Sequence, residues 1–145
     1  YEWEEWANDT HLLDAFTGSG IISVEAFSRN LKKATLVESN TTIYNNVKKN
    51  IERFNLIEKV NLINSDFFNV NFKKNQFSLV YLDPPYSNDY TNKAIDKLLD
   101  EKALTKHALL ISETRKDYNY NKNLHKFINI SKKYGETLLT FFKFN

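Results

Sequence analysis

Residues 83–86, Asp83-Pro84-Pro85-Tyr86, have side chains suited to holding an amine. Two prolines remove two backbone N–H donors and stiffen the turn, so the Asp83 carboxylate and the Pro84 carbonyl become fixed hydrogen-bond acceptors. Two such acceptors match the N–H groups of an exocyclic nucleobase amine, and Tyr86 can stack on the base. A base inside a duplex must first be flipped out. We therefore predict that these four residues are catalytic.

A glycine-containing turn forms a second candidate site. Residues 14–20 read Asp-Ala-Phe-Thr-Gly-Ser-Gly, and they follow an apolar run and precede a helical pattern. Glycines at such a turn let the backbone approach a nucleotide-like ligand closely. A dinucleotide fingerprint needs a third glycine where this chain has Ser23, which disfavours a nicotinamide or flavin enzyme. The pattern resembles motif I of the S-adenosylmethionine-dependent methyltransferases, which implies cofactor binding by Asp14, Phe16, Gly18 and Gly20.

Further acids follow the next two apolar runs. Glu38 lies eighteen residues beyond Gly20, where a carboxylate can accept hydrogen bonds from both ribose hydroxyls. Asp66 would lie near the adenine amino group, and the Phe67 ring beside the base. For both acids the alternative is a role at the start of a helix. We predict that Glu38, Asp66 and Phe67 complete the cofactor site.

The elements that position these residues alternate along the chain. Five apolar runs predict strands at 12–16, 34–38, 60–64, 77–82 and 108–112, and helical spacing predicts helices at 21–29, 41–54 and 93–104. Two further strands, 127–131 and 137–144, are joined by too short a turn for a crossover, so they should be antiparallel. This order predicts an α/β fold with a seven-stranded, mostly parallel sheet and helices on both faces. The acids then lie at the carboxyl ends of strands, where such folds bind ligands.

A resemblance to one family covers about residues 13–144. The chain is similar to the RsmD-type 16S ribosomal RNA guanine-N2 methyltransferases. The similarity lies in the glycine turn and in Val24-Glu25-Ala26, Ser28-Arg29, Val37-Glu38-Ser39, Leu82 to Tyr86, Lys133 to Thr137 and Thr140-Phe141-Phe142. The Tyr-Gly-Glu-Thr stretch within them is the most family-specific part. The resemblance implies a Rossmann-like class I methyltransferase fold, S-adenosylmethionine as cofactor, and ribosomal RNA or the assembling small subunit as partner.

Composition bounds these expectations. The chain has 145 residues, 41% of them hydrophobic, which fits one domain over residues 1–145. Family members carry a segment before motif I, so we expect this chain to be truncated at its N-terminus. The sequence holds no apolar run long enough for a membrane span and no cysteine, which rules out a disulfide framework and fits a reducing cytoplasm. We expect a cytoplasmic monomer.

The charge is unevenly distributed. Residues 1–105 carry twelve basic and fifteen acidic side chains (net −3), whereas residues 106–145 carry eight and three (net +5). Arg115, Lys116 and Lys122 are candidates for RNA backbone contact, and the tyrosines interleaved with them, Tyr118 and Tyr120, are candidates for base stacking. The three histidines stand alone at positions 11, 107 and 125, so we predict no metal site.

Two other functions are compatible with part of these motifs. Adenine-N6 methyltransferases acting on DNA or RNA use the same tetrapeptide, but the DNA enzymes usually add a target-recognition domain, for which the gaps between motifs here are too short. A non-catalytic nucleotide-binding or RNA-binding module would have no need of the rigid acceptor pair at Asp83 and Pro84.

Overall fold

The computed structural model describes residues 10–18, 26–27, 31–84 and 89–144. The chain divides into two compact units, residues 1–70 (unit 1) and residues 71–145 (unit 2). The described residues contain seven strands, the number that the sequence predicts. That residues 1–145 form a single domain stays a prediction.

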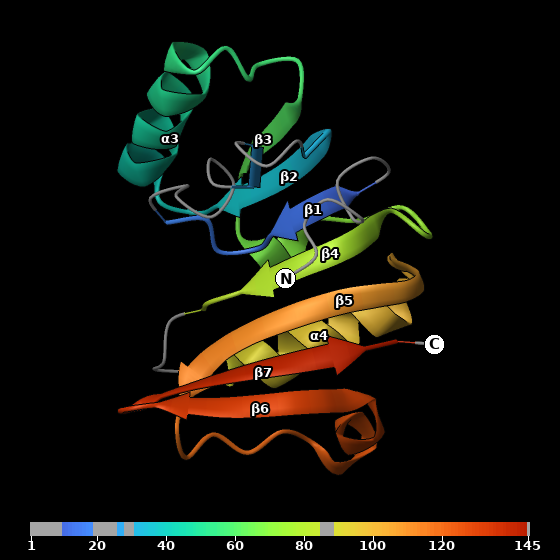
Figure 1. The fold of residues 1–145 in the computed structure, drawn as a ribbon. Coiled ribbons are helices and arrows are strands. Elements are labelled where there is room, and N and C mark those ends of the chain that lie inside the picture. The colour runs from blue at the N-terminus through green and yellow to red at the C-terminus, as the bar shows by residue number, and fades with distance from the viewer. Residues whose placement is uncertain (1–9, 19–25, 28–30, 85–88, 145) are drawn as a thin grey trace. The chain divides into compact units, whose positions relative to one another are not determined.

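Unit 1 is built on three parallel strands in the order β3-β2-β1, with α3 packed beside β2 and β3 (Figure 1). Residues 34–37 of β2 are all buried, as expected for a central parallel strand covered on both faces. Because the three strands are parallel and in register, their carboxyl ends lie at one edge. The elements of unit 1 are β1 (His11–Asp14), β2 (Lys33–Glu38), α3 (Thr41–Arg53), β3 (Val60–Asn64) and the short 3-10 helix η1 (Phe67–Asn69).

The ends of α3 follow from local chemistry. The Asn40 side chain accepts a hydrogen bond from the Ile43 N–H at 3.0 Å and so caps the first turn. Val47 and Ile51, four residues apart, form the buried face. Asn55, with φ of 57°, ends the helix in a left-handed conformation. The predicted helix over 41–54 is thus confirmed to within one residue.

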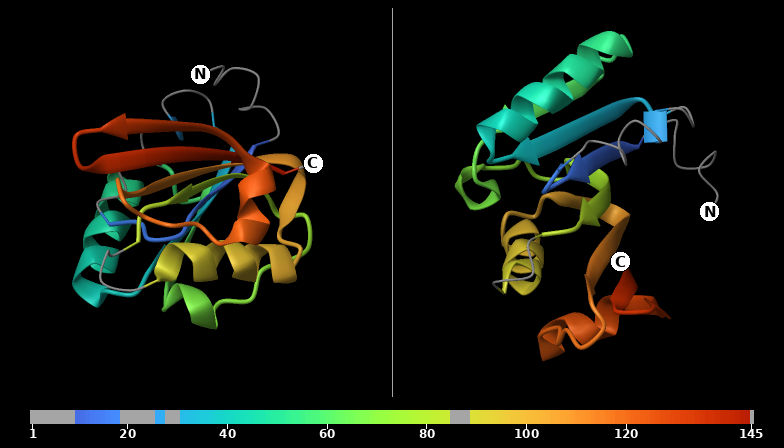
Figure 2. Two further views of the ribbon diagram at one scale, coloured as in Figure 1. Left: turned by 90° about the horizontal axis from the view of Figure 1, so that it is seen from below. Right: turned by 90° about the vertical axis from the view of Figure 1, so that its left-hand side faces the viewer.

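Unit 2 has the strand order β4-β5-β7-β6, and α4 runs along one side of its strands (Figure 2). β4 and β5 are parallel, whereas β7 pairs antiparallel with both β5 and β6, so the predicted antiparallel pair is confirmed. The elements of unit 2 are β4 (Phe77–Leu82), α4 (Tyr90–Asp100), β5 (Leu104–Arg115), the 3-10 helix η2 (Lys122–Phe127), β6 (Ile128–Tyr134) and β7 (Thr137–Lys143).

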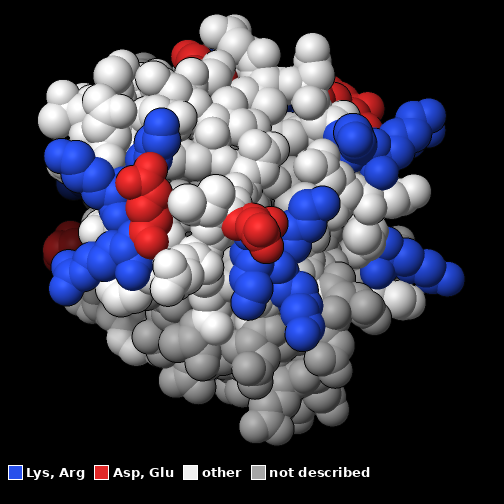
Figure 3. Space-filling view, turned by 90° about the horizontal axis from the view of Figure 1, so that it is seen from above, with Lys and Arg blue, Asp and Glu red and all other residues white. Residues whose placement is uncertain are grey.

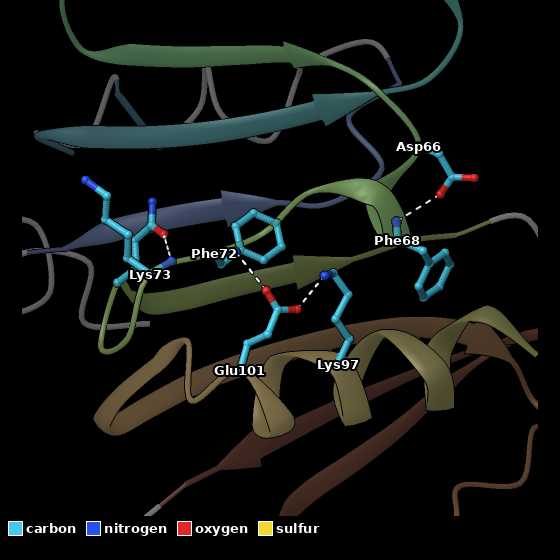
Figure 4. A network of polar contacts seen from close by, with 7 residues as sticks. Asp66, Phe68, Phe72, Lys73, Lys97 and Glu101 are labelled. Atoms are coloured by element: carbon cyan, nitrogen blue, oxygen red, sulfur yellow. Dashed lines mark hydrogen bonds and ion pairs between the residues drawn. The ribbon is translucent and has the colours of Figure 1, made fainter.

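The predicted bounds of α4 are wrong at both ends, since the helix covers residues 90–100 and not 93–104. Lys102 has φ of 54°, and its N–H donates to the Leu99 carbonyl, which turns the chain out of the helix. Glu101 fixes this end: its carboxylate accepts from the Phe72 N–H at 2.8 Å and pairs with Lys97 (Figure 4).

β5 is much longer than the predicted strand over 108–112. Its first residues, Leu104 to His107, include three polar residues that hide the strand from a hydrophobic pattern, and they join β4 through an irregular register. At the other end, pairing with β7 extends the strand as far as Arg115, opposite Thr137. Of the helix predicted over 21–29, the structure describes only Ala26 and Phe27, which are helical.

Candidate active site

The turn after β1 is tied to the end of β2 within unit 1. Asp14, 2% exposed, ends β1, and its carbonyl accepts from the Thr17 hydroxyl at 3.1 Å. The Gly18 N–H donates to Glu38 Oε1 at 2.9 Å. Gly18 has φ of +57°, and a Cβ there would meet nothing nearer than 4.0 Å, so this backbone conformation is what requires glycine. Gly20 lies outside the described residues.

Glu38 makes a contact with each of its carboxylate oxygens. Oε1 accepts from Gly18, and Oε2 accepts from the Asn40 N–H at 2.9 Å. The alternative interpretation was that Glu38 caps the following helix, but the cap of α3 is Asn40, and Glu38 only accepts from the N–H of that residue. An ionised carboxylate has about four lone-pair sites, so Glu38 keeps acceptor capacity for further donors such as hydroxyls. Its role toward a ribose stays a prediction.

Asp66 and Phe67 are held by contacts of their own. Asp66 caps η1, because Oδ1 accepts from the Phe68 N–H at 2.9 Å (Figure 4). Phe67 is 2% exposed and packs against Phe16, with ring centroids 5.4 Å apart. Both residues thus have structural tasks, capping and core packing. Their contact with an adenine ring stays a prediction.

Asp83 follows β4 in unit 2, at the carboxyl edge that β4 shares with β5. Although the residue is exposed, partial burial of its carboxyl group and, to a lesser extent, the charge of Glu113 raise the pKa of Asp83 to about 6. Pro84 is buried behind it. Pro85 and Tyr86, the other predicted catalytic residues, lie outside the described residues.

Sequence reasoning missed two residues beside Asp83. Glu113 lies near the end of β5, and the Tyr81 hydroxyl donates to its Oε2 at 2.5 Å. The pairing of Leu82 with Ser112 places these side chains together, which no local pattern reveals. The signal available in the sequence was an acid one residue beyond the predicted fifth strand.

The three predicted RNA-binding cations are all exposed in unit 2. Arg115 ends β5 and Lys122 begins η2. Lys116, half exposed, pairs with Glu136 at 3.0 Å, so part of its charge is already neutralised. On the face seen from the end of α3 and β3, Lys and Arg side chains stand in separate groups among acidic ones (Figure 3). That face fits a solvated surface.

The predicted stacking role of Tyr120 is wrong. Its side chain is 9% exposed, and its hydroxyl donates to Ser112 Oγ at 2.9 Å. The neighbouring Tyr118 donates to Asp89 at 2.5 Å and accepts from the Asn92 N–H at 2.9 Å. The two tyrosines therefore anchor their segment to the protein.

Among the helices that the structure describes, none combines the length and the apolar character that a membrane span needs. Across residues 10–18, 26–27, 31–84 and 89–144, no three His, Asp or Glu side chains are grouped so that they could hold a metal ion.

Solved structures of similar fold identify the class. A Haemophilus influenzae protein of known crystal structure is 30% identical, with a TM-score of 0.85 over 96% of this chain and 89% of that one. A tRNA methyltransferase from M. jannaschii, 24% identical, matches in fold with a TM-score of 0.76 over 99% of this chain and 45% of that one. The fold is therefore that of the class I methyltransferases, as predicted.

The family follows from the sequence comparison. The model of the family described as "Conserved hypothetical protein 95" matches residues 2–143, and the chain belongs to this family. A Haemophilus influenzae relative called ribosomal RNA small subunit methyltransferase D is 34% identical over 116 residues, or 77% of this chain. The resemblance to the RsmD type is thus confirmed. The chain spans 60% and 62% of the length of the first two curated relatives it matches.

Proposed function

We propose that this protein transfers a methyl group from S-adenosylmethionine to the exocyclic N2 amine of a guanine in 16S ribosomal RNA. The observation that carries the proposal is the position of Asp83, an acceptor at the carboxyl end of β4. Partial burial and, secondly, the charge of Glu113 raise the pKa of this carboxyl group to about 6. Family membership and the names of the curated relatives support ribosomal RNA as the substrate.

Unit 1 has a set of residues that fits the cofactor. Three acids, Asp14, Glu38 and Asp66, follow or end neighbouring parallel strands, and this acidic edge suits a ligand with a sulfonium and an ammonium charge. Glu38 would accept from the ribose, with Gly18 and Gly20 at the turn and Phe16 and Phe67 on the apolar side. S-adenosylmethionine supplies an electrophilic methyl group when bound.

Unit 2 has the residues for the target amine. The Asp83 carboxylate and the Pro84 carbonyl accept the two N–H groups and orient the nitrogen lone pair, while Pro85 stiffens the turn and Tyr86 stacks on the guanine. Asp83 also stabilises the positive charge that develops on the nitrogen. The exposed side chains of Arg115, Lys116 and Lys122 would contact RNA phosphates.

The partner in this proposal is ribosomal RNA or the assembling small subunit, in the cytoplasm, with the protein acting as a monomer. The test supplies the purified protein with isotope-labelled S-adenosylmethionine and either unmodified 16S RNA or small-subunit particles, followed by nucleoside mass spectrometry. We expect labelled N2-methylguanosine. Labelled N6-methyladenosine would favour the alternative target, and no label in either substrate would refute the enzymatic function.

A further inference from the structure

Glu113 is the second carboxylate at the edge where Asp83 lies. β4 and β5 are parallel with Leu82 opposite Ser112. The residues that follow these are Asp83, just beyond the end of β4, and Glu113, within β5, and the charge of Glu113 acts on Asp83. Tyr81 lies opposite Ile111 in this register, and its hydroxyl donates to Glu113 Oε2 at 2.5 Å.

Glu113 lies on β5, between the neighbouring strands β4 and β7. On the side away from β4, Glu113 faces Leu139 of β7, an apolar residue. On the other face of β5, Ser112 Oγ accepts a hydrogen bond from the Tyr120 hydroxyl, and this bond fixes the end of the strand. Among the described residues of these strands, Glu113 on β5 is thus the titratable group whose charge acts on Asp83, Tyr81 on β4 binds Glu113, and the β7 residue paired with Glu113 is Leu139.

We propose that Glu113 is a positioning residue for Asp83: held by the Tyr81 hydroxyl, its negative charge adds to the effect of partial burial, and together they make Asp83 the acceptor of the proton that the target amine releases. This inference rests on the proposed function. A negative charge near a carboxylate disfavours its ionised form, so it raises the proton affinity of that carboxylate.

The proton balance of the reaction requires such an acceptor. When the bond from the amine nitrogen to the methyl carbon forms and the bond from sulfur to that carbon breaks, the nitrogen carries one proton too many. Asp83 takes this proton and passes it to water. With a pKa of about 6, Asp83 is about nine-tenths ionised at pH 7, yet it is a stronger base than an ordinary aspartate.

A titration of Asp83 tests the inference without any turnover. The side-chain carboxyl carbons are followed by NMR, with the Asp83 signal assigned by its loss in Asp83→Asn. We expect a midpoint near pH 6 in the parent protein and a lower midpoint in Glu113→Gln. The control Glu58→Gln, the same change at an exposed residue of unit 1, should leave the midpoint unchanged. An unchanged midpoint in Glu113→Gln would overturn the inference.

Two further measurements separate charge from structure. Glu113→Asp keeps the charge, so its Asp83 midpoint should lie above that of Glu113→Gln, and equal midpoints would again overturn the inference. In methyl transfer, Glu113→Gln should lower the turnover number about two- to fivefold at neutral pH and move the acidic limb of the rate profile to lower pH. If the parent protein methylates no RNA, the proposed function fails, while the titration still decides the coupling.

Discussion

At the scale of single residues, the carboxylates at the strand ends differ in their surroundings, and the differences suggest their tasks. Each carboxylate oxygen of Glu38 accepts a hydrogen bond from one backbone N–H, so the carboxylate is held in one orientation. Asp83 is partly desolvated beside a second carboxylate, which favours binding a proton. The first environment suits a fixed acceptor for a ligand, and the second suits a base.

Replacing Glu38 should weaken cofactor binding. Glu38→Ala removes hydrogen bonds from a charged acceptor, and we expect a loss of about 1.5 to 3 kcal/mol in the free energy of S-adenosylmethionine binding. Isothermal titration calorimetry measures it, with Glu58→Ala as the control at an exposed site. A folded Glu38→Ala variant with the dissociation constant of the parent would assign Glu38 to the turn and the helix start alone.

Replacing Asp83 should affect the rate and leave cofactor binding nearly unchanged. We expect Asp83→Ala to lower methyl transfer at least about a hundredfold, the scale for losing one preorganised partner of the transition state. In the parent, activity should fall as the pH drops through about 6, since protonated Asp83 cannot accept the amine proton. Asp100→Ala, at the exposed end of α4, is the control. Near-parental rates in Asp83→Ala would contradict the assignment.

At the scale of elements, the segment after β5 is fastened to the start of α4. Tyr118 contacts Asp89 and the Asn92 N–H, and the buried Asn92 side chain binds the backbone of Asn119 and Asn121. The segment has few apolar residues, so side-chain hydrogen bonds replace core packing there. They also hold Asp89, the N-cap of α4, which lies six residues after Asp83.

The Tyr118→Phe variant should show how much this attachment contributes. It loses two hydrogen bonds, so the free energy of unfolding should fall by about 1 to 3 kcal/mol in chemical denaturation. Burial, and secondly the bond to Asp89, raise the pKa of Tyr118. A raised pKa in the folded state contributes its full stability below the pKa of the unfolded tyrosine, and this contribution declines as the pH rises above about 10.

The stability difference between the parent and Tyr118→Phe should therefore narrow above pH 10. Phe144→Leu, a change in the core of the same unit, is the matched control, because its effect should not depend on pH in this range. A constant difference for Tyr118→Phe from pH 8 to pH 11 would contradict the role given to its hydroxyl.

At the scale of the whole molecule, the two units carry opposite net charge. Unit 1 has seven basic and ten acidic residues, a net charge of −3, and unit 2 has thirteen and eight, a net charge of +5. An anionic unit repels RNA phosphates and a cationic one attracts them. We therefore expect the electrostatic part of RNA binding to depend on unit 2.

Salt dependence measures this contribution. Each phosphate contact adds about 0.7 to 0.9 to the slope of log affinity against log salt, so replacing Arg115, Lys116 and Lys122 by Gln should flatten that slope by roughly two. The pairing of Lys116 with Glu136 reduces its share. Replacing Lys32, Lys48 and Lys49 removes the same charge from unit 1 and should leave the slope nearly unchanged. Equal effects of both triple variants would mean that net charge alone attracts the RNA.

The sequence by itself determined the order of elements and the motifs. Buried strands and amphipathic helices have local signatures, so the strands ending at Glu38 and Leu82 and the helix from Thr41 could be located without coordinates. The first strand, predicted over 12–16, covers His11–Asp14 and so ends two residues earlier than predicted. The tetrapeptide beginning at Asp83 and the glycine turn are equally local, because their chemistry depends on neighbours along the chain.

Only the tertiary structure decided which side chains meet. Glu113 and Tyr81 lie thirty-two residues apart, and their contact depends on the register of β4 against β5. Likewise, Tyr120 has the sequence context of a surface loop, yet its side chain is buried and its hydroxyl donates to Ser112 Oγ on β5. Hydrophobic periodicity reports burial along one element, whereas contacts across strands and the burial of polar loops depend on residues that are distant in the sequence. Those contacts could not be predicted for this reason.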